Sequence, residues 1–286
     1  MKVMITGANG QLGRDLVELI GQQHETVGLG RNQLDIRNLK QCKQVVREIK
    51  PNVILHTAAY TAVDLAESQE DEAYAVNAYG SRNIAMAAEE IGAKLCYIST
   101  DYVFDGTAAT PYKEYDATNP QGVYGKSKYA GEQLVQSFSS QYFILRTSWV
   151  YGQHGNNFVK TMLKLGREKD QLMVVHDQIG SPTYTVDLCR FLLELIKTDN
   201  FGIYHASNSG QCSWYEFAQA IFEESQIHIK VIPCTTEQFP RPAARPPYSV
   251  MNHLAIRANG LTDLRPWRKA LKEFLQTVNS NNTNSD

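Results

Sequence analysis

The chain opens with MKVMITGANGQLG, residues 1–13, and this stretch decides the fold. Residues 2–6 form a short apolar run, which predicts a β-strand. Three glycines follow with the spacing GxxGxxG, and from Leu12 apolar residues recur at helical spacing. Because glycine has no Cβ, such a turn lets the backbone approach a pyrophosphate, which the start of the next helix then stabilises. We therefore expect a dinucleotide-binding turn made of Gly7, Asn9, Gly10, Gln11, Leu12 and Gly13. The alternative is a structural turn with incidental glycines, which the position between a strand and a helix disfavours.

The first half of the chain alternates strands with helices. Further strands are predicted at residues 26–29, 53–57, 94–99 and 142–146, and helices at 39–50, 73–91 and 126–138. This alternation is typical of an α/β fold, here a Rossmann-like, doubly wound parallel sheet with helices on both faces.

After about residue 147 the regular alternation of strands with helices changes. Helices are predicted at residues 157–167, 185–196, 214–224 and 266–278, strands at 171–176, 203–206 and 229–232, and a proline-rich extended segment at 239–247. We therefore expect a smaller C-terminal α/β lobe that binds substrate. The predicted division is a Rossmann domain of residues 1–148 and 177–207, a substrate lobe of 149–176 and 208–278, and a disordered tail of 279–286.

The composition of the chain argues against several classes of function. The 286 residues carry a formal net charge of −2, so no basic field attracts nucleic acid or an anionic membrane. The five cysteines are scattered without CxxC or Cys/His spacing, which argues against a disulfide framework or a zinc site and fits a reducing compartment. The N-terminus lacks a signal-peptide core, and no apolar run approaches the roughly 20 residues of a membrane span. We expect a cytoplasmic protein that binds neither nucleic acid nor membrane.

The end of the second strand indicates the cofactor. Enzymes that use NAD place an acidic side chain there for the ribose 2′-hydroxyl, whereas residues 28–32 contain Arg31 and no carboxylate. Arg31 therefore favours NADPH, with NADH possible and an ordinary solvated arginine as the alternative. Asp35 and Ile36 are expected beside the adenine. The segment after the third strand should flank the phosphates and ribose, through Ala58, Ala59, Tyr60 and Thr61.

Tyr124 and Lys128 form a YxxxK motif on a predicted helix. Residues four apart lie on the same face, so the ammonium should lower the tyrosine pKa from its usual value of about 10. Tyr124 could then give a proton to a carbonyl oxygen as hydride reaches the carbon, while Lys128 could also bind the nicotinamide ribose. The alternative for this motif alone is a helix with an exposed lysine.

A third group follows the fourth strand. The Thr100 hydroxyl is placed to hold a substrate carbonyl beside Tyr124, and Ser99 is expected on the cofactor side. The alternative for Ser99 and Thr100 is a strand-end cap. Three such features in this order favour a reductase.

At this point the chain resembles the extended short-chain dehydrogenase/reductase family and, within it, the branch of dTDP-4-dehydrorhamnose reductases. The narrower resemblance depends on residues 57–68 (TAAYTAVDLAES), 99–106 (STDYVFDG), 122–128 (GVYGKSK), 146–152 (RTSWVYG), 155–163 (GNNFVKTML), 177–184 (DQIGSPTY) and 241–252 (RPAARPPYSVMN). It covers nearly the whole chain apart from the polar tail.

The resemblance implies NADPH-dependent reduction of the 4-keto group of dTDP-4-dehydro-L-rhamnose to dTDP-L-rhamnose, for cell-surface polysaccharide. It implies that Thr100, Tyr124 and Lys128 are catalytic. Asp101, Tyr102 and Trp149 would line the sugar pocket, and Arg241 and Arg245 would contact the diphosphate or nucleotide. For the arginines the alternative is solvation, and for Trp149 it is core packing. A homodimer is implied, no metal ligand is assigned, and a divalent ion such as Mg²⁺ stays open.

Two rival functions remain. A dehydratase or epimerase of the same superfamily is one, but a dehydratase needs a glutamate where this chain has Tyr102. The other is a non-enzymatic, NADP-sensing regulatory subunit, which would not require intact Thr100, Tyr124 and Lys128.

Overall fold

The centre of the computed structural model, which describes residues 1–283, is a six-stranded sheet. The strand order is β10-β5-β4-β3-β1-β2, and every neighbouring pair is parallel. The strands are β1 (Lys2–Thr6), β2 (Glu25–Leu29), β3 (Val53–His56), β4 (Lys94–Thr100), β5 (Tyr142–Thr147) and β10 (Gly202–His205). All four residues of β3 are buried, as expected for a strand covered on both faces. The predicted α/β fold with a doubly wound parallel sheet is confirmed.

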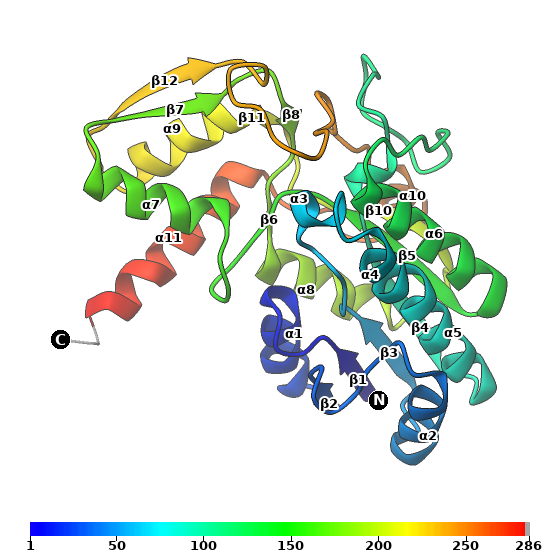
Figure 1. The fold of residues 1–286 in the computed structure, drawn as a ribbon. Helices are drawn as coiled ribbons and strands as arrows, with labels where there is room; N and C mark the ends of the chain where they lie inside the picture. Colours follow the sequence, from blue (N-terminus) through cyan, green and yellow to red (C-terminus); the bar gives the residue numbers. More distant parts are fainter. Residues whose placement is uncertain (284–286) are drawn as a thin grey trace.

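Helices cover both faces of this sheet (Figure 1). On one face lie α1 (Gln11–Gly21) and α8 (Thr185–Leu195), where Leu16 and Leu188 are fully buried in the same core cluster. On the other face lie α2 (Leu39–Ile49), α5 (Ser81–Glu90) and α6 (Val123–Phe138), where Val46 and Val135 are fully buried in a second cluster. Apolar side chains of these helices therefore cover the sheet on both faces.

The strand order reverses between β1 and β3, and this reversal positions the site. In open parallel sheets, ligands bind beyond the carboxyl ends of the strands at such a point. The turn after β1, the segment after β3 and the end of β4 meet there. The short helix η2 (Asp101–Val103) follows β4 directly.

The helix predicted at residues 73–91 is irregular and begins earlier. It consists of α4 (Glu70–Tyr74), the π-helical segment η1 (Ala75–Gly80) and α5. Asn77, in the π-helical segment, exchanges hydrogen bonds with the Tyr60 backbone at 2.8 and 3.1 Å and donates to the Ser127 hydroxyl at 3.0 Å. The wider turn thus aims a polar side chain at two neighbouring segments, as π-bulges at functional sites often do.

The helix α6 also begins earlier than predicted, at Val123 instead of Lys126. The carboxylate of Glu67 accepts a hydrogen bond from the Val123 backbone N–H at 2.9 Å. Because this partner is 56 residues away, the local sequence carries no capping signal for it.

A smaller lobe lies beside the sheet (Figure 1). Its core contains the fully buried rings of Phe217 and Phe274. Its strand pairs are β7 (Gln171–Val175) with β12 (Lys230–Cys234), β8 (Ile179–Gly180) with β11 (Cys212–Ser213), and β6 (Val150–Tyr151) with β9 (Thr183–Tyr184). Its helices are α7 (Phe158–Glu168), α9 (Trp214–Glu224) and α11 (Trp267–Thr283).

Three segments differ from the predicted division. The strands β8 and β9 fall within the part predicted for the Rossmann domain, 177–207, but pair with β11 and β6 of the smaller lobe. The helix α11 continues to Thr283, although a disordered tail is predicted from residue 279. The Ser280 hydroxyl donates a hydrogen bond to the Gln276 carbonyl at 2.9 Å, which is the four-residue spacing of a helix. The rest of that predicted tail, residues 284–286, lies outside the described residues. Ile256 of α10 (Leu254–Ala258) packs in the core on the sheet side, because α10 contacts β10.

Within residues 1–283, no helix has both the length and the apolar character that crossing a bilayer requires.

Candidate active site

A cleft of about 860 Å³ lies at the reversal point of the sheet. Its lining includes the turn after β1, the ends of β2, β3 and β4, the first turns of α6 and residues 147–150. It brings together twenty of the residues that the sequence singles out: Gly7, Asn9, Gly10, Gln11, Leu12, Gly13, Arg31, Asp35, Ile36, Ala58, Ala59, Tyr60, Thr61, Ser99, Thr100, Asp101, Tyr102, Tyr124, Lys128 and Trp149.

The glycine-rich turn has the shape that a pyrophosphate needs. Gly7 has a φ of +68°, and a Cβ there would lie 2.6 Å from the Ala58 backbone nitrogen. A Cβ on Gly13 would lie 2.2 Å from the Gly7 carbonyl oxygen. Gly10 caps α1 without a side-chain hydrogen bond, which leaves backbone N–H groups at the start of the helix for an anion. This turn fits a dinucleotide cofactor.

Arg31 lies at the same end of the cleft, with its side chain 74% exposed. Its guanidinium is 3.6 Å from the Glu72 carboxylate, and Arg37 contacts that carboxylate at 3.1 Å. Arg37 also hydrogen-bonds Asp35, which lowers the pKa of the Asp35 carboxyl. Sequence reasoning found Arg31 but missed Arg37 and Glu72, because the contact with α4 joins segments far apart in the chain. Both guanidinium groups therefore contact the same Glu72 carboxylate at this end of the cleft, and the phosphate contact of Arg31 stays a prediction.

The proposed catalytic hydroxyls meet where β4 and α6 approach. Thr100 is the last residue of β4, and Tyr124 lies in the first turn of α6. The Thr100 hydroxyl donates to Asp101 Oδ1 at 3.0 Å, and it also acts to lower the pKa of the Tyr124 phenol. Burial has the larger effect and raises the pKa of Tyr124 to about 12. The expectation of a lowered tyrosine pKa is therefore wrong for this arrangement.

The surroundings of Lys128 explain why the pKa of Tyr124 is not lowered. Its side chain is only 2% exposed, and its ammonium nitrogen donates to the Ile98 carbonyl oxygen at 2.6 Å. The nitrogen also lies 4.2 Å from the centre of the Tyr97 ring. Burial lowers the pKa of Lys128 to about 7, in spite of the Glu132 carboxylate nearby. A lysine that is only partly charged at neutral pH is a weak source of positive field for Tyr124.

A buried ion pair between α6 and β5 lies close to the site. Glu132 and Arg146 are 0% and 2% exposed, and Arg146 donates to the two Glu132 carboxylate oxygens at 2.8 and 3.0 Å. The Ser99 hydroxyl donates to the same carboxylate. Ser99 thus ties β4 to α6. Sequence reasoning missed Glu132, although its position four residues after Lys128 on the same helix face was a usable signal.

Asp101 and Tyr102 line the side of the cleft that the resemblance assigns to the sugar. Asp101 is 1% exposed, and burial raises the pKa of its carboxyl to about 6. The Tyr102 ring meets the Tyr124 ring edge to face, with centroids 5.5 Å apart. The Tyr102 ring, which makes an apolar contact, and the protonatable Asp101 carboxyl therefore lie next to Tyr124.

Trp149 lies between the cleft and the smaller lobe, and its contact with the sugar stays a prediction. It has a φ of +48°, lines the cleft and stacks on Trp214 of α9 with ring centroids 3.5 Å apart. One face of the indole is therefore packed against the smaller lobe. This side chain links the cleft to the smaller lobe.

Arg241 and Arg245 are not among the residues that line the cleft. Arg245 donates to the Asp64 carboxylate at 2.6 Å, which lowers the pKa of Asp64, and Arg241 lies over the Phe239 ring at 4.8 Å. Arg245 is nevertheless close enough to Tyr102 to influence its titration. The Arg245–Asp64 ion pair joins the proline-rich segment to α3 (Val63–Ala66) beside the cleft.

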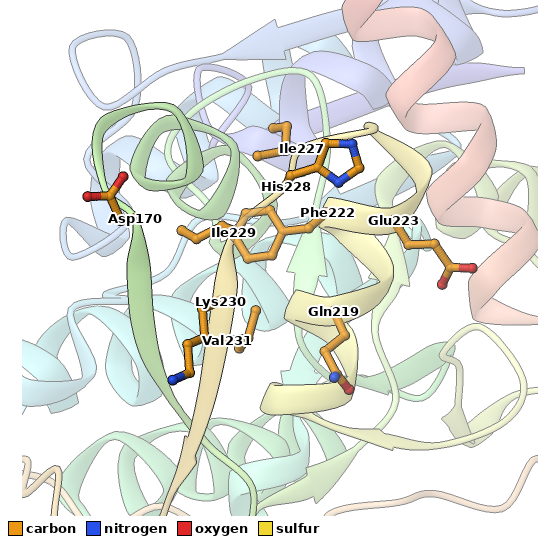
Figure 2. Close-up of a pocket in the computed structure, with 9 residues that line it drawn as sticks. All are labelled: Asp170, Gln219, Phe222, Glu223, Ile227, His228, Ile229, Lys230 and Val231. Atoms are coloured by element: carbon orange, nitrogen blue, oxygen red, sulfur yellow. The ribbon is translucent and has the colours of Figure 1, made fainter.

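A second cavity lies in the smaller lobe, between α9 and the strands β7 and β12. Figure 2 shows Phe222 and Glu223 on the helix side, and Ile229 and Lys230 on the strand side. Its lining lacks the glycine turn and the phenol, hydroxyl and ammonium groups of the first cleft. In the described part of the chain, no group of three or more His, Cys, Asp or Glu side chains could hold a metal ion.

Comparison with known proteins agrees with this geometry. The family model described as "RmlD substrate binding domain" matches residues 1–280. The chain is 45% identical to the spore coat polysaccharide biosynthesis protein SpsK of Bacillus subtilis, with 98% of each covered, and 42% identical to dTDP-4-dehydrorhamnose reductase of Aggregatibacter actinomycetemcomitans, with 96% and 98% covered. A crystal structure of dTDP-4-dehydrorhamnose reductase from Bacillus anthracis in complex with NADP is 49% identical, with a TM-score of 0.95 and 96% and 99% coverage. The chain therefore belongs to the RmlD substrate binding domain family.

Proposed function

We propose that this protein reduces the 4-keto group of dTDP-4-dehydro-L-rhamnose to give dTDP-L-rhamnose, with NADPH as the reductant. The observation that carries this proposal is the meeting of Thr100, Tyr124 and Lys128 with the glycine-rich turn in one cleft. Full-length relatives with this activity in their names support the choice of substrate.

Each group has a defined task in the proposed reaction. Bound NADPH supplies the hydride. The turn at residues 7–13 and the Arg31–Arg37 pair hold the cofactor, and the Thr100 hydroxyl orients the substrate carbonyl. The Tyr124 phenol gives its proton to the carbonyl oxygen as the new C–H bond forms. Much of the rate comes from holding the reactants in contact.

The substrate assignment covers the smaller lobe as well. We assign the sugar to Asp101, Tyr102 and Trp149, and the diphosphate or nucleotide to Arg241 and Arg245. The division into a Rossmann domain (1–148, 177–207) and a substrate lobe (149–176, 208–278) belongs to the same proposal. An Arg245→Ala variant should raise the KM for the sugar nucleotide and leave the KM for NADPH unchanged. Equal changes in the two constants would contradict this assignment.

The stereochemistry of the sugar is tested by comparing two substrates. NADPH oxidation is measured with dTDP-4-dehydro-L-rhamnose and with its unepimerised 4-keto-6-deoxy-D-gluco counterpart. The proposal expects a clear preference for the first, with dTDP-L-rhamnose as product. A preference for the second would make the protein a different 4-ketoreductase. Failure to oxidise NADPH with either sugar would favour the regulatory role.

Location and assembly complete the proposal. All five cysteines are free and buried, which suits a reducing compartment, so we assign the protein to the cytoplasm. The homodimer that the resemblance implies is tested by sedimentation of the purified protein. Activity before and after removal of divalent ions by EDTA tests the open question of Mg²⁺.

A further inference from the structure

Two side-chain amides join the cofactor turn to the start of the smaller lobe. Gln11 is the first residue of α1 and lines the cleft. Its Nε2 atom donates to the Val150 carbonyl oxygen at 3.1 Å, and its Oε1 atom accepts from Asn157 Nδ2 at 2.9 Å. These partners lie 139 and 146 residues further along the chain, in β6 and directly before α7. In Figure 1 the loop that connects β6 to α7 comes down beside α1.

Asn157 performs two tasks with two different atoms. Its Oδ1 atom accepts a hydrogen bond from the Lys160 backbone N–H at 3.0 Å and so caps α7. Its Nδ2 atom donates to the Gln11 side chain and also to the Gly152 carbonyl oxygen at 2.9 Å, which uses both amide hydrogens. A serine or an aspartate can keep the cap, but neither can make the two donations. The capping of α7 and the link to Gln11 can therefore be separated by substitution.

The link leads to the residue next to Trp149. Gln11 holds the carbonyl oxygen of Val150, which directly follows Trp149 in the chain. Trp149 has a φ of +48°, a conformation that is unfavourable for a bulky side chain and persists only when its surroundings impose it. Its ring stacks on Trp214, and a Cβ on Gly180 would lie 2.5 Å from that ring, so the indole is closely enclosed. The backbone that places Trp149 in the cleft is thus tied to the cofactor turn.

We propose that Asn157 is a positioning residue that couples the cofactor turn to the sugar subsite. It holds the Gln11 amide, and this amide holds the backbone next to Trp149. The inference rests on the proposed function, which assigns the sugar to Trp149. Asn157 is not among the residues that line the cleft, so it acts on the two ligands through Gln11.

The coupling follows from the place of Gln11 in the turn. The first N–H groups of α1 have no partner within the helix, and they are the donors that a pyrophosphate would use. A cofactor held there fixes the backbone of Gln11, and with it the amide that reaches Val150 and Asn157. The sugar then meets a wall that is already ordered, so less conformational entropy is lost when it binds. Each ligand should therefore bind more tightly when the other is present.

The test compares the affinity for dTDP-L-rhamnose with and without saturating NADPH. Both ligands are in the reduced form, so the complex cannot turn over, and calorimetry gives each Kd. In the wild type, NADPH should lower the Kd of dTDP-L-rhamnose at least about tenfold, within the usual range of coupling between two sites. In Asn157→Ser this coupling factor should be at least about fivefold smaller than in the wild type. The Tm should stay close to that of the wild type, because serine keeps the cap of α7.

Asn38→Ser is the matched control. Asn38 caps α2 by accepting a hydrogen bond from the Gln41 backbone N–H at 3.1 Å, and it is not among the residues that line the cleft. The same substitution should therefore leave the coupling factor at the wild-type value. Asn157→Asp is a second variant in case serine disturbs the loop. Aspartate keeps the cap and the shape of the side chain but places an oxygen against the Gln11 oxygen, so the coupling factor should fall in the same way.

The outcomes that contradict the inference are distinct from those that contradict the proposed function. An equal coupling factor in the wild type and in both Asn157 variants would overturn the inference, and so would an equal loss in Asn38→Ser. A lower Tm with an unchanged coupling factor would mean that Asn157 only caps α7. Failure of the wild type to bind dTDP-L-rhamnose while it binds NADPH would contradict the proposed function, and the inference with it.

Discussion

The ammonium nitrogen of Lys128 donates a hydrogen bond to the carbonyl oxygen of Ile98 across 2.6 Å, and so joins α6 to β4. This contact holds the two elements that carry Tyr124 and Thr100. It also keeps the lysine buried, where its charged form is penalised. Lys128 therefore has a structural task in addition to its expected contact with the nicotinamide ribose.

Lys128→Met should reduce the pH dependence of stability. Burial lowers the pKa of Lys128 from its ordinary value of 10.5 to about 7 in the folded protein, so the unfolded chain binds more protons between those values. Wild-type stability should therefore rise with pH from about 7 towards 10 through this group, and the variant should lack that rise. Denaturant unfolding at several pH values measures the difference between the two proteins. Lys126→Met, at an exposed lysine of the same helix, should retain the wild-type slope, and the same slope in both variants would contradict the prediction.

Arg31→Glu should shift cofactor preference towards NADH. The substitution removes a cation next to Arg37 and adds a second carboxylate beside Glu72, which repels a 2′-phosphate. We expect the ratio of kcat/KM for NADPH to that for NADH to fall at least about tenfold, the cost of losing one charge-assisted contact. Arg167→Glu, on α7 in the smaller lobe, serves as the charge-matched control. If the ratio were the same before and after the Arg31 change, the phosphate assignment would be wrong.

Asn77→Ala should destabilise the protein and loosen the cofactor site together. Asn77 is fully buried and makes three hydrogen bonds, two to the backbone of Tyr60 and one to Ser127. Unpairing these groups should lower the free energy of unfolding by about 2 to 3 kcal/mol. The KM for NADPH should rise, because Tyr60 lines the cleft. Asn259→Ala, at an exposed asparagine, should change neither quantity; a stable Asn77 variant with normal KM would refute the prediction.

Local sequence patterns predicted the parts of the site that depend on local geometry. The glycine spacing after β1 and the four-residue spacing of Tyr124 and Lys128 follow from the chain itself, and the cleft contains all of these residues. The missed contacts join remote segments. Glu72 reaches Arg31 from α4, Glu67 caps α6, and Glu132 pairs with Arg146 across the interior.

The direction in which the Tyr124 pKa shifts could not be predicted either, because it also depends on contacts between remote segments. The four-residue spacing places Lys128 on the correct face, but burial of both groups decides their protonation. Burial depends on how β4, α6 and η2 pack, which the local pattern does not contain. The π-helical turn at Asn77 is likewise set by its contacts with Tyr60 and Ser127.

The central claim is that the Tyr124 phenol protonates the keto oxygen, and a Tyr124→Phe variant tests it most directly. NADPH binding by fluorescence and turnover of dTDP-4-dehydro-L-rhamnose are measured on the same preparation. The account predicts an NADPH Kd close to that of the wild type and a kcat lower by a factor of about 100 or more, the usual contribution of a general acid. Turnover near the wild-type rate in a correctly folded variant would contradict it.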